Sequence, residues 1–266
     1  MNIYHEAPLS IFKKVQKMTD GDYCLVHLLE ESEEYKNAFL DAVKQGRTVI
    51  LDNSIFELGE AFDGDLFAKW IEILKPTYYI IPDVFNDSQQ TINNFNDWVN
   101  NYSGLPGKMM AVAQGNTEDE FIECYKYLVD KVDKIAISFC YNFLKHSKIS
   151  TKHAVYDEFF SIMANRQALL SNMLKRDIIN KNKPHHLLGC TLPQEFKAYK
   201  NYQWIDSIDT SNPVVAGLMG IKYTEDGLTT KPTQKLFTLI NDEINVEQFQ
   251  CIEYNINKFK TFCGRS

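Results

Sequence analysis

Four short segments of this chain place a run of apolar residues directly before a carboxylate or amide side chain. They cover residues 49–52, 80–83, 111–115 and 207–209, and they end at Asp52, Asp83, Gln114-Gly115 and Asp209. Such endings are typical of parallel strands, because polar side chains collect at the carboxyl edge of a parallel barrel or doubly wound sheet. We therefore expect one convergent polar site built from several strand ends.

The apolar runs alternate with helix-like stretches. We expect strands at residues 23–29, 48–52, 78–84, 109–114, 134–139, 186–190 and 205–209. We expect helices at residues 32–44, 65–74, 88–100, 117–129, 156–172, from 193 onward, and over the tail 231–260. Thr117 and Glu120 have the spacing of a capping box. The strands are apolar almost throughout, which indicates that both of their faces are covered.

Repeated strand–helix units at this spacing favour an α/β fold, a (β/α)8 TIM-like barrel, over an open sheet. The eighth strand has no clear segment: either residues 214–221 supply it, or the barrel is irregular there. No internal repeat or long linker divides the chain, so we expect residues 1–266 to form a single barrel domain.

Composition excludes several classes of protein. The net charge of −7 argues against a basic coat for nucleic acid, although lysines and arginines concentrate between residues 131 and 183. No apolar run approaches the roughly 18 residues of a membrane helix, and the first residues lack a signal-peptide layout, so a cytoplasmic protein without membrane contact is expected. The six cysteines form no CxxC pair, and we expect neither a metal site nor a cofactor.

The strand-end carboxylates have two interpretations each. Asp52 can act as an acid or base, or it can cap the loop that follows it. A buried Asp83 needs a partner, which is the N–H edge of a base or an ordinary ion pair or cap. Asp209 can attack a sugar carbon to form a covalent glycosyl intermediate, or it can hold an Asx-type turn.

Other residues are candidates for binding a flat ligand. Gln114 can donate and accept hydrogen bonds together, and Gly115 and Gly189 let the backbone approach a ligand closely. Phe56 and Leu188 can stack on the two faces of a base, or they are ordinary core residues. The adjacent histidines at 185 and 186 face opposite ways on a strand, so we do not expect them to share a metal ion.

Taken together and in order, these segments resemble the tRNA-guanine transglycosylase family. Residues 51–56 look like the segment with the family's Asp and stacking aromatic, and Asp83 matches its base-recognising Asp. Residues 113–115 resemble its Gln-Gly turn, residues 187–193 its stacking residue and Gly, and residues 207–209 the tripeptide with its nucleophilic Asp.

The chain also departs from that family. Ser54-Ile55 replace the paired glycines, and the three Cys and one His that bind zinc after the nucleophile are missing, with no insertion for a zinc subdomain. A compact, zinc-free chain looks most like the transglycosylase-like proteins of bacteriophages and bacterial DNA-modification systems. The resemblance therefore favours DNA over tRNA as the substrate.

The resemblance implies a pentosyltransferase that exchanges guanine in nucleic acid for a 7-deazaguanine such as preQ0 or preQ1. Asp209 would be the nucleophile and Asp52 the proton-transfer group. Asp83, Gln114 and Gly115 would read the base edge, and Phe56, Leu188 and Gly189 would line its faces. Two alternatives stay open: a nucleoside or glycoside hydrolase that uses the same carboxylates, and a non-catalytic binding barrel. The segment 141–152 is a candidate lid, and the oligomeric state is not determined.

Overall fold

The chain folds into a closed barrel of parallel strands in a computed structural model that describes residues 1–146 and 154–265. Neighbouring strands follow the chain order, and β8 pairs back onto β1. The strands are β1 Asn2–Tyr4, β2 Gly21–Leu25, β3 Thr48–Asp52, β4 Tyr78–Ile80, β5 Lys108–Val112, β6 Lys134–Ser138, β7 His185–Leu188 and β8 Ile205–Asp209. The predicted (β/α)8 TIM-like barrel is confirmed.

The strand that closes the barrel lies at the N-terminus and not at residues 214–221. Asn2 pairs with Ser207 and Tyr4 with Asp209, so β1 fills the gap between β8 and β2. Residues 214–218 of that segment instead belong to α10 Asn212–Leu218, which has a proline in its first turn, where the missing N–H has no partner to lose. The irregularity is a register shift between His185 and His186, where β7 pairs with β8.

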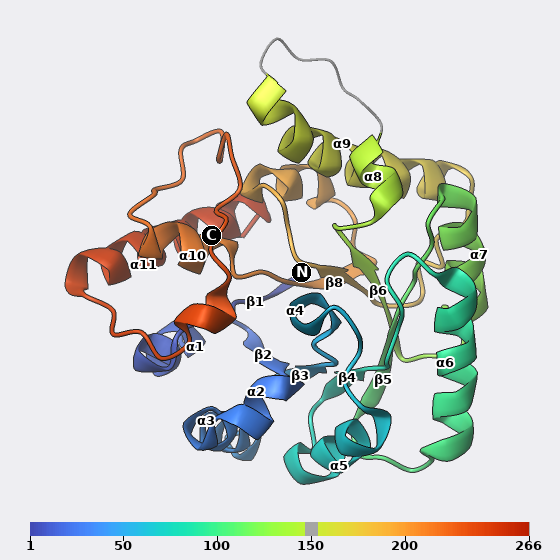
Figure 1. The fold of residues 1–266 in the computed structure, drawn as a ribbon. Coiled ribbons are helices and arrows are strands. Elements are labelled where there is room, and N and C mark those ends of the chain that lie inside the picture. Colours follow the sequence, from blue (N-terminus) through green and yellow to red (C-terminus); the bar gives the residue numbers. More distant parts are fainter. Residues whose placement is uncertain (147–153, 266) are drawn as a thin grey trace.

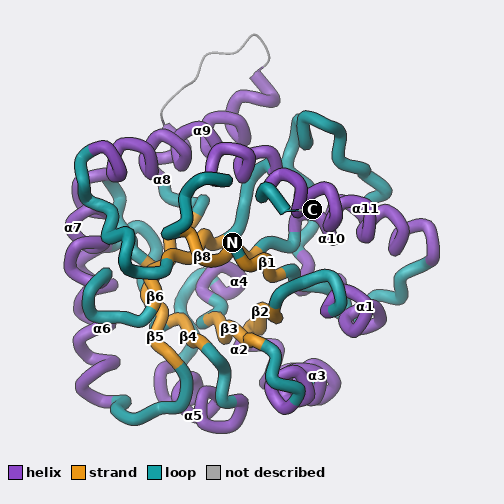
Figure 2. Tube along the Cα trace, turned by 180° about the vertical axis from the view of Figure 1, so that it is seen from behind, coloured by secondary structure: helices purple, strands orange, loops and turns teal. Residues whose placement is uncertain are grey.

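Helices surround the barrel, which is visible from both sides in Figures 1 and 2. The longer ones are α3 Glu33–Lys44, α5 Gly64–Leu74, α6 Ser88–Asn101, α7 Glu118–Leu128, α9 Ala154–Lys175 and α11 Val246–Phe262. The short ones are α1 Phe12–Gln16, α2 Val26–Glu31, α4 Ile55–Leu58 and α8 Asn142–His146, with 3-10 turns η1 Leu9–Ile11, η2 Pro193–Tyr199 and η3 Leu236–Leu239.

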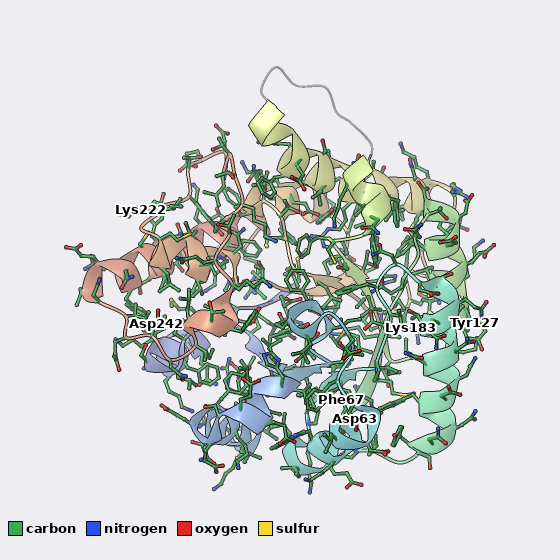
Figure 3. The ribbon with its side chains drawn as sticks, viewed as in Figure 1. Asp63, Phe67, Tyr127, Lys183, Lys222 and Asp242 are labelled. Atoms are coloured by element: carbon green, nitrogen blue, oxygen red, sulfur yellow. The ribbon has the colours of Figure 1, made fainter. Side chains whose placement is uncertain are left out.

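Side-chain caps fix where these helices begin. The capping box of Thr117 and Glu120 at the start of α7 is confirmed. Asp63 caps α5, and Phe67, one turn later, is buried against Trp98 of α6 with ring centroids 5.7 Å apart, so the cap also sets how α5 packs (Figure 3). No helix in the described part of the chain has the length and apolar character needed to cross a membrane.

Several predicted boundaries were wrong for local reasons. The strand predicted at 23–29 ends at Leu25, because α2 begins at Val26 with no intervening loop. The strand predicted at 78–84 ends at Ile80, before Pro82. The tail is not helical throughout: residues 231–245 hold only η3, and α11 begins after Asn245, which caps it. Residues 147–152 of the candidate lid lie outside the described residues.

Candidate active site

A cavity of about 360 Å³ opens at the carboxyl ends of the strands, where the sequence predicts a polar site. Seven of the eight predicted site residues line it: Asp52, Phe56, Asp83, Gln114, Leu188, Gly189 and Asp209. The cavity is rich in carboxylates, since Glu6 and Glu57 join the three predicted aspartates. Negative charges that lie close together disfavour one another, so the carboxyl groups of this cavity cannot all be ionised at equal cost. The hydrogen bonds and burial of each group decide which of them carries the charge.

Asp209 ends β8 with one carboxylate oxygen held and the other free. Its Oδ1 accepts a hydrogen bond from His186 Nε2 at 2.9 Å and one from the Gly189 backbone N–H at 3.2 Å. Its Oδ2 accepts none from the described residues. Two N–H donors on Oδ1 fix the orientation of the carboxyl group and leave Oδ2 available to a ligand in the cavity.

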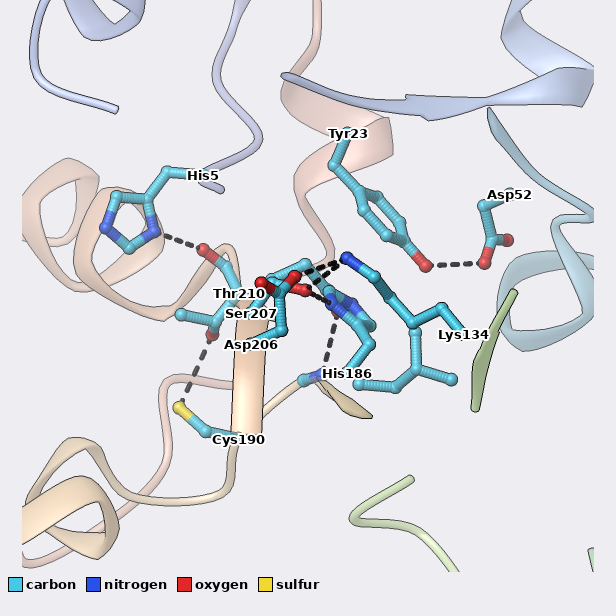
Figure 4. A network of polar contacts seen from close by, with 12 residues as sticks. His5, Tyr23, Asp52, Lys134, His186, Cys190, Asp206, Ser207 and Thr210 are labelled. Carbon is cyan, nitrogen blue, oxygen red and sulfur yellow. Dashed lines mark hydrogen bonds and ion pairs between the residues drawn. The ribbon is translucent and has the colours of Figure 1, made fainter. Parts of the chain in front are cut away.

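A chain of hydrogen bonds runs from Lys134 through Ser207 to His186 (Figure 4), and His186 in turn bonds Asp209. Lys134 Nζ donates to Asp206 Oδ2 at 2.5 Å and to Ser207 Oγ at 3.1 Å, and Ser207 Oγ lies 2.8 Å from His186 Nδ1. Because an ammonium group can only donate, the Ser207 hydroxyl proton is free to bond Nδ1. That assigns the remaining imidazole proton to Nε2, facing Asp209. Burial lowers the pKa of His186, which keeps the ring neutral, although Asp209 opposes the shift.

Asp52 is held on both carboxylate oxygens. Tyr23 donates its hydroxyl to Oδ2 at 2.5 Å, and the backbone N–H of Ser54 donates to Oδ1 at 2.6 Å. Ser54 has a left-handed φ of 60°, a conformation that this hydrogen bond supports. Burial, and then the charge of Glu57, raise the pKa of Asp52 well above its usual range. Asp52 therefore caps the turn that follows it, which was one of its two predicted roles, and it also lines the cavity.

Asp83 forms a polar cluster with two side-chain amides. Asn53 Nδ2 donates to Oδ1 at 2.7 Å, and Gln114 Nε2 donates to Oδ2 at 2.6 Å. Gln114 Oε1 in turn accepts from the Asn86 backbone N–H at 3.1 Å. Burial raises the pKa of Asp83, and the two amides oppose that shift. The cluster presents a fixed pattern of donors and acceptors to whatever occupies the cavity.

The apolar walls come from three aromatic and aliphatic side chains. Phe56, half of whose surface is exposed, lies near Phe139 with ring centroids 6.0 Å apart, and Leu188 is half-buried on β7. Lys231 Nζ lies 4.0 Å from the Phe139 ring centroid and lines the cavity as well. The exposed ring of Phe56 offers a surface on which a flat ring can stack, and Lys231 adds a positive charge beside Phe139 in the same cavity.

The two predicted glycines make different contacts. Gly189 has a φ of +60°, and an added Cβ would lie 2.6 Å from the Phe139 ring, so this position needs glycine to place its N–H on Asp209. Gly115 does not line the cavity. An added Cβ there would lie 2.3 Å from the Phe121 backbone nitrogen, which shows that Gly115 lets β5 and α7 pack closely.

Arg166 of α9 supports the site from behind, a role that the sequence analysis missed. Its Nε donates to Glu195 Oε1 at 2.6 Å, and its terminal nitrogens donate to the carbonyls of Leu188 at 3.0 Å and Gly189 at 2.9 Å. Arg166 and Glu195 are both fully buried. This ion pair holds the β7 turn that delivers the Gly189 N–H to Asp209.

Glu57 is the second functional candidate that the sequence analysis missed, although it lies within the segment that follows Asp52. Its Oε2 is buried and has no hydrogen-bond partner in the described part of the chain. Burial raises the pKa of Glu57 to about 7, with a contribution from the charge of Asp209. Burial, and then the negative charge of Glu57, raise the pKa of Glu6 as well. No pattern in the sequence indicated that Glu6 would line the cavity.

Within the described ranges, no three His, Cys, Asp or Glu side chains are grouped so that they could hold a metal ion. In comparisons with known proteins, neither protein-family models nor curated proteins match this chain. The chemistry of the site therefore rests on its own geometry.

Proposed function

We propose that this protein is a base-exchange transglycosylase that replaces guanine in nucleic acid with a 7-deazaguanine, with DNA as the favoured polymer. The observation that carries the proposal is the state of Asp209. It combines one oxygen fixed by two N–H donors with one oxygen free to react, in a cavity that also contains the Asp83 cluster. A nucleophile and a base-reading group that line one cavity are what base exchange requires.

In the first half-reaction, Asp209 Oδ2 attacks C1′ of the target nucleotide. The C1′–N9 bond breaks, its electron pair goes to the departing guanine, and that base takes up a proton. The product is a sugar ester of Asp209, and the reaction involves no oxidation or reduction. The N–H groups of His186 and Gly189 hold Asp209 in the geometry for attack.

In the second half-reaction, the incoming base loses its N9 proton and attacks C1′ from the face that guanine left. The ester C–O bond breaks and Asp209 leaves as a carboxylate. His186 and Gly189 then stabilise the negative charge that returns to Oδ1, as donors placed where charge develops. The net result is one base out and one base in on an unchanged sugar.

The Asp83 cluster is suited to read the base. Guanine and 7-deazaguanines present adjacent N–H donors, and a carboxylate whose oxygens are already oriented by Asn53 and Gln114 matches that edge. Phe56 and Leu188 line the same cavity and offer surfaces for stacking. The target base must leave its stack to reach this depth, and Lys231 and Lys235 at the cavity could contact the phosphates of the flipped nucleotide.

The test is incorporation of radiolabelled guanine, preQ0 or preQ1 into duplex DNA, single-stranded DNA and bulk tRNA. Label should enter DNA, and Asp209→Asn should reduce incorporation at least about 10³-fold, as expected for loss of a covalent nucleophile. Incorporation into tRNA alone would assign the other polymer. Release of guanine with no incoming base would identify a hydrolase, and wild-type binding retained by the variant without any turnover would identify a binding barrel.

A further inference from the structure

Of the carboxylates that line the cavity, Asp52 and Glu57 lie closest in sequence, and they differ in which of their oxygens accept hydrogen bonds. Both oxygens of Asp52 accept short hydrogen bonds, from Tyr23 and from the Ser54 backbone. Glu57 lies on the short helix α4, which follows β3, and lines the same cavity with a buried oxygen that has no partner among the described residues. An unpartnered buried oxygen is costly, whereas a carboxyl group that exchanges a proton with a ligand has use for it.

We infer that Glu57, and not Asp52, carries the proton between the leaving and the entering base, and that the charge on Asp209 controls when it does so. The inference rests on the proposed base exchange. Asp52 then acts as a positioning residue, which fixes the 52–54 turn and thereby the start of α4, the helix that carries Glu57.

The charges that face Glu57 all come from the cavity. Asp209 of β8 raises the pKa of Glu57 and Lys235 lowers it, after burial as the largest cause. Asp52 and Glu6 are also within electrostatic reach, because the charge of Glu57 raises the pKa of each. Of these groups, only Asp209 changes charge through covalent chemistry in the proposed reaction, so it alone can switch the proton affinity of Glu57 during turnover.

The proton then moves in step with the covalent bond. When Asp209 forms the ester, it loses its negative charge and the pKa of Glu57 falls, so protonated Glu57 gives its proton to the departing guanine. The carboxylate of Glu57 next accepts the N9 proton of the entering base. As the ester breaks, the negative charge returns to Asp209, the pKa of Glu57 rises again, and the proton is retained for the next cycle.

The first test needs no turnover. Glutamate side-chain carboxyls labelled with ¹³C are titrated by NMR in the wild type, in Glu57→Gln to assign the resonance, and in Asp209→Asn as a neutral mimic of the ester. The Glu57 resonance should titrate near pH 7 and shift downward by about one unit in Asp209→Asn. A Glu57 titration in the ordinary glutamate range, or one unchanged in Asp209→Asn, would overturn the coupling.

The second test follows base exchange against pH. Glu57→Gln should lower the rate about 10²–10⁴-fold and remove the pH dependence near 7, as for loss of a general acid–base group. Glu60→Gln is the matched control, since Glu60 is exposed three residues further along the same segment and does not line the cavity. It should leave the rate and pH profile unchanged, whereas Asp52→Asn should lower the rate and keep the profile.

A pH profile lost in Asp52→Asn but kept in Glu57→Gln would overturn the assignment in favour of Asp52. If the wild type exchanges no base in any polymer, the proposed function fails and the catalytic role of Glu57 fails with it. The NMR titration then still decides the coupling between Glu57 and Asp209, so the two failures are distinguishable.

Discussion

Replacing Arg166 with methionine tests whether the buried ion pair behind the cavity supports the site. Methionine keeps much of the aliphatic stem and removes the guanidinium, which leaves the fully buried Glu195 without its counter-charge. It also leaves the carbonyls of Leu188 and Gly189 without their donors. Tyr199, which donates to Glu195 at 2.7 Å, is the partner that remains.

The expected cost follows from what is left unpaired. Removing one partner of a buried ion pair destabilises a protein by about 3–5 kcal/mol, because the other charge stays buried without compensation. We therefore expect Arg166→Met to lower the free energy of unfolding by at least about 3 kcal/mol. Adding Glu195→Gln removes the uncompensated charge and keeps an acceptor for Tyr199, so the double variant should recover part of this loss. The unrecovered part reports the two carbonyls, at about 1–3 kcal/mol for each orphaned group.

The assay is urea unfolding monitored by fluorescence, with midpoint and slope compared between variants. Arg176→Met is the control: Arg176 lies just beyond the end of the same helix, and its ion pair with Glu118 is exposed at 3.7 Å. A surface pair of this kind contributes about 0–1 kcal/mol. If Arg166→Met loses no more stability than Arg176→Met, the ion pair does not hold the β7 turn as described.

Two further predictions concern the histidines of β7. His185 Nδ1 donates to the Lys183 carbonyl, and its Nε2 lies 2.9 Å from the Tyr125 hydroxyl oxygen. Burial of the ring lowers the pKa of His185 to about 4. As the pH falls, the unfolded chain binds a proton at His185 before the folded chain does. Protonation of His185 should therefore lower the free energy of unfolding by about 3 kcal/mol between pH 6.5 and pH 4. Urea titrations over this pH range should show that loss in the wild type and not in His185→Gln. At position 186, a glutamine retains an N–H donor for Asp209, whereas a leucine does not. We therefore expect the base-exchange rate to fall at least about 10-fold further in His186→Leu than in His186→Gln. Equal rates in the two variants would show that the donor is not needed.

The fold could be predicted from the sequence wherever the signal was local. β3 and β8 were predicted at their observed bounds, since each ends with an apolar residue followed by an aspartate. β1 could not be predicted, because it has only three residues and exists through its pairing with β8 and β2. Residues 214–221 illustrate the opposite error: a buried apolar run is ambiguous between strand and helix, and here its first part, residues 214–218, belongs to α10.

The site could be predicted as a set of positions, while the state of each carboxylate could not. Asp52, Asp209 and Glu57 line one cavity, but their oxygens differ. Asp209 accepts two hydrogen bonds on one oxygen, Asp52 accepts one on each oxygen, and Glu57 has an oxygen without a partner among the described residues. No pattern in the sequence distinguishes these three states. Those differences depend on Tyr23, His186 and other groups that reach the site from distant strands. In a cavity with several carboxylates, the hydrogen-bond donors that reach each oxygen therefore decide which group is the nucleophile and which moves the proton. A match of sequence segments can assign those roles only if the matched segments also contain the donors.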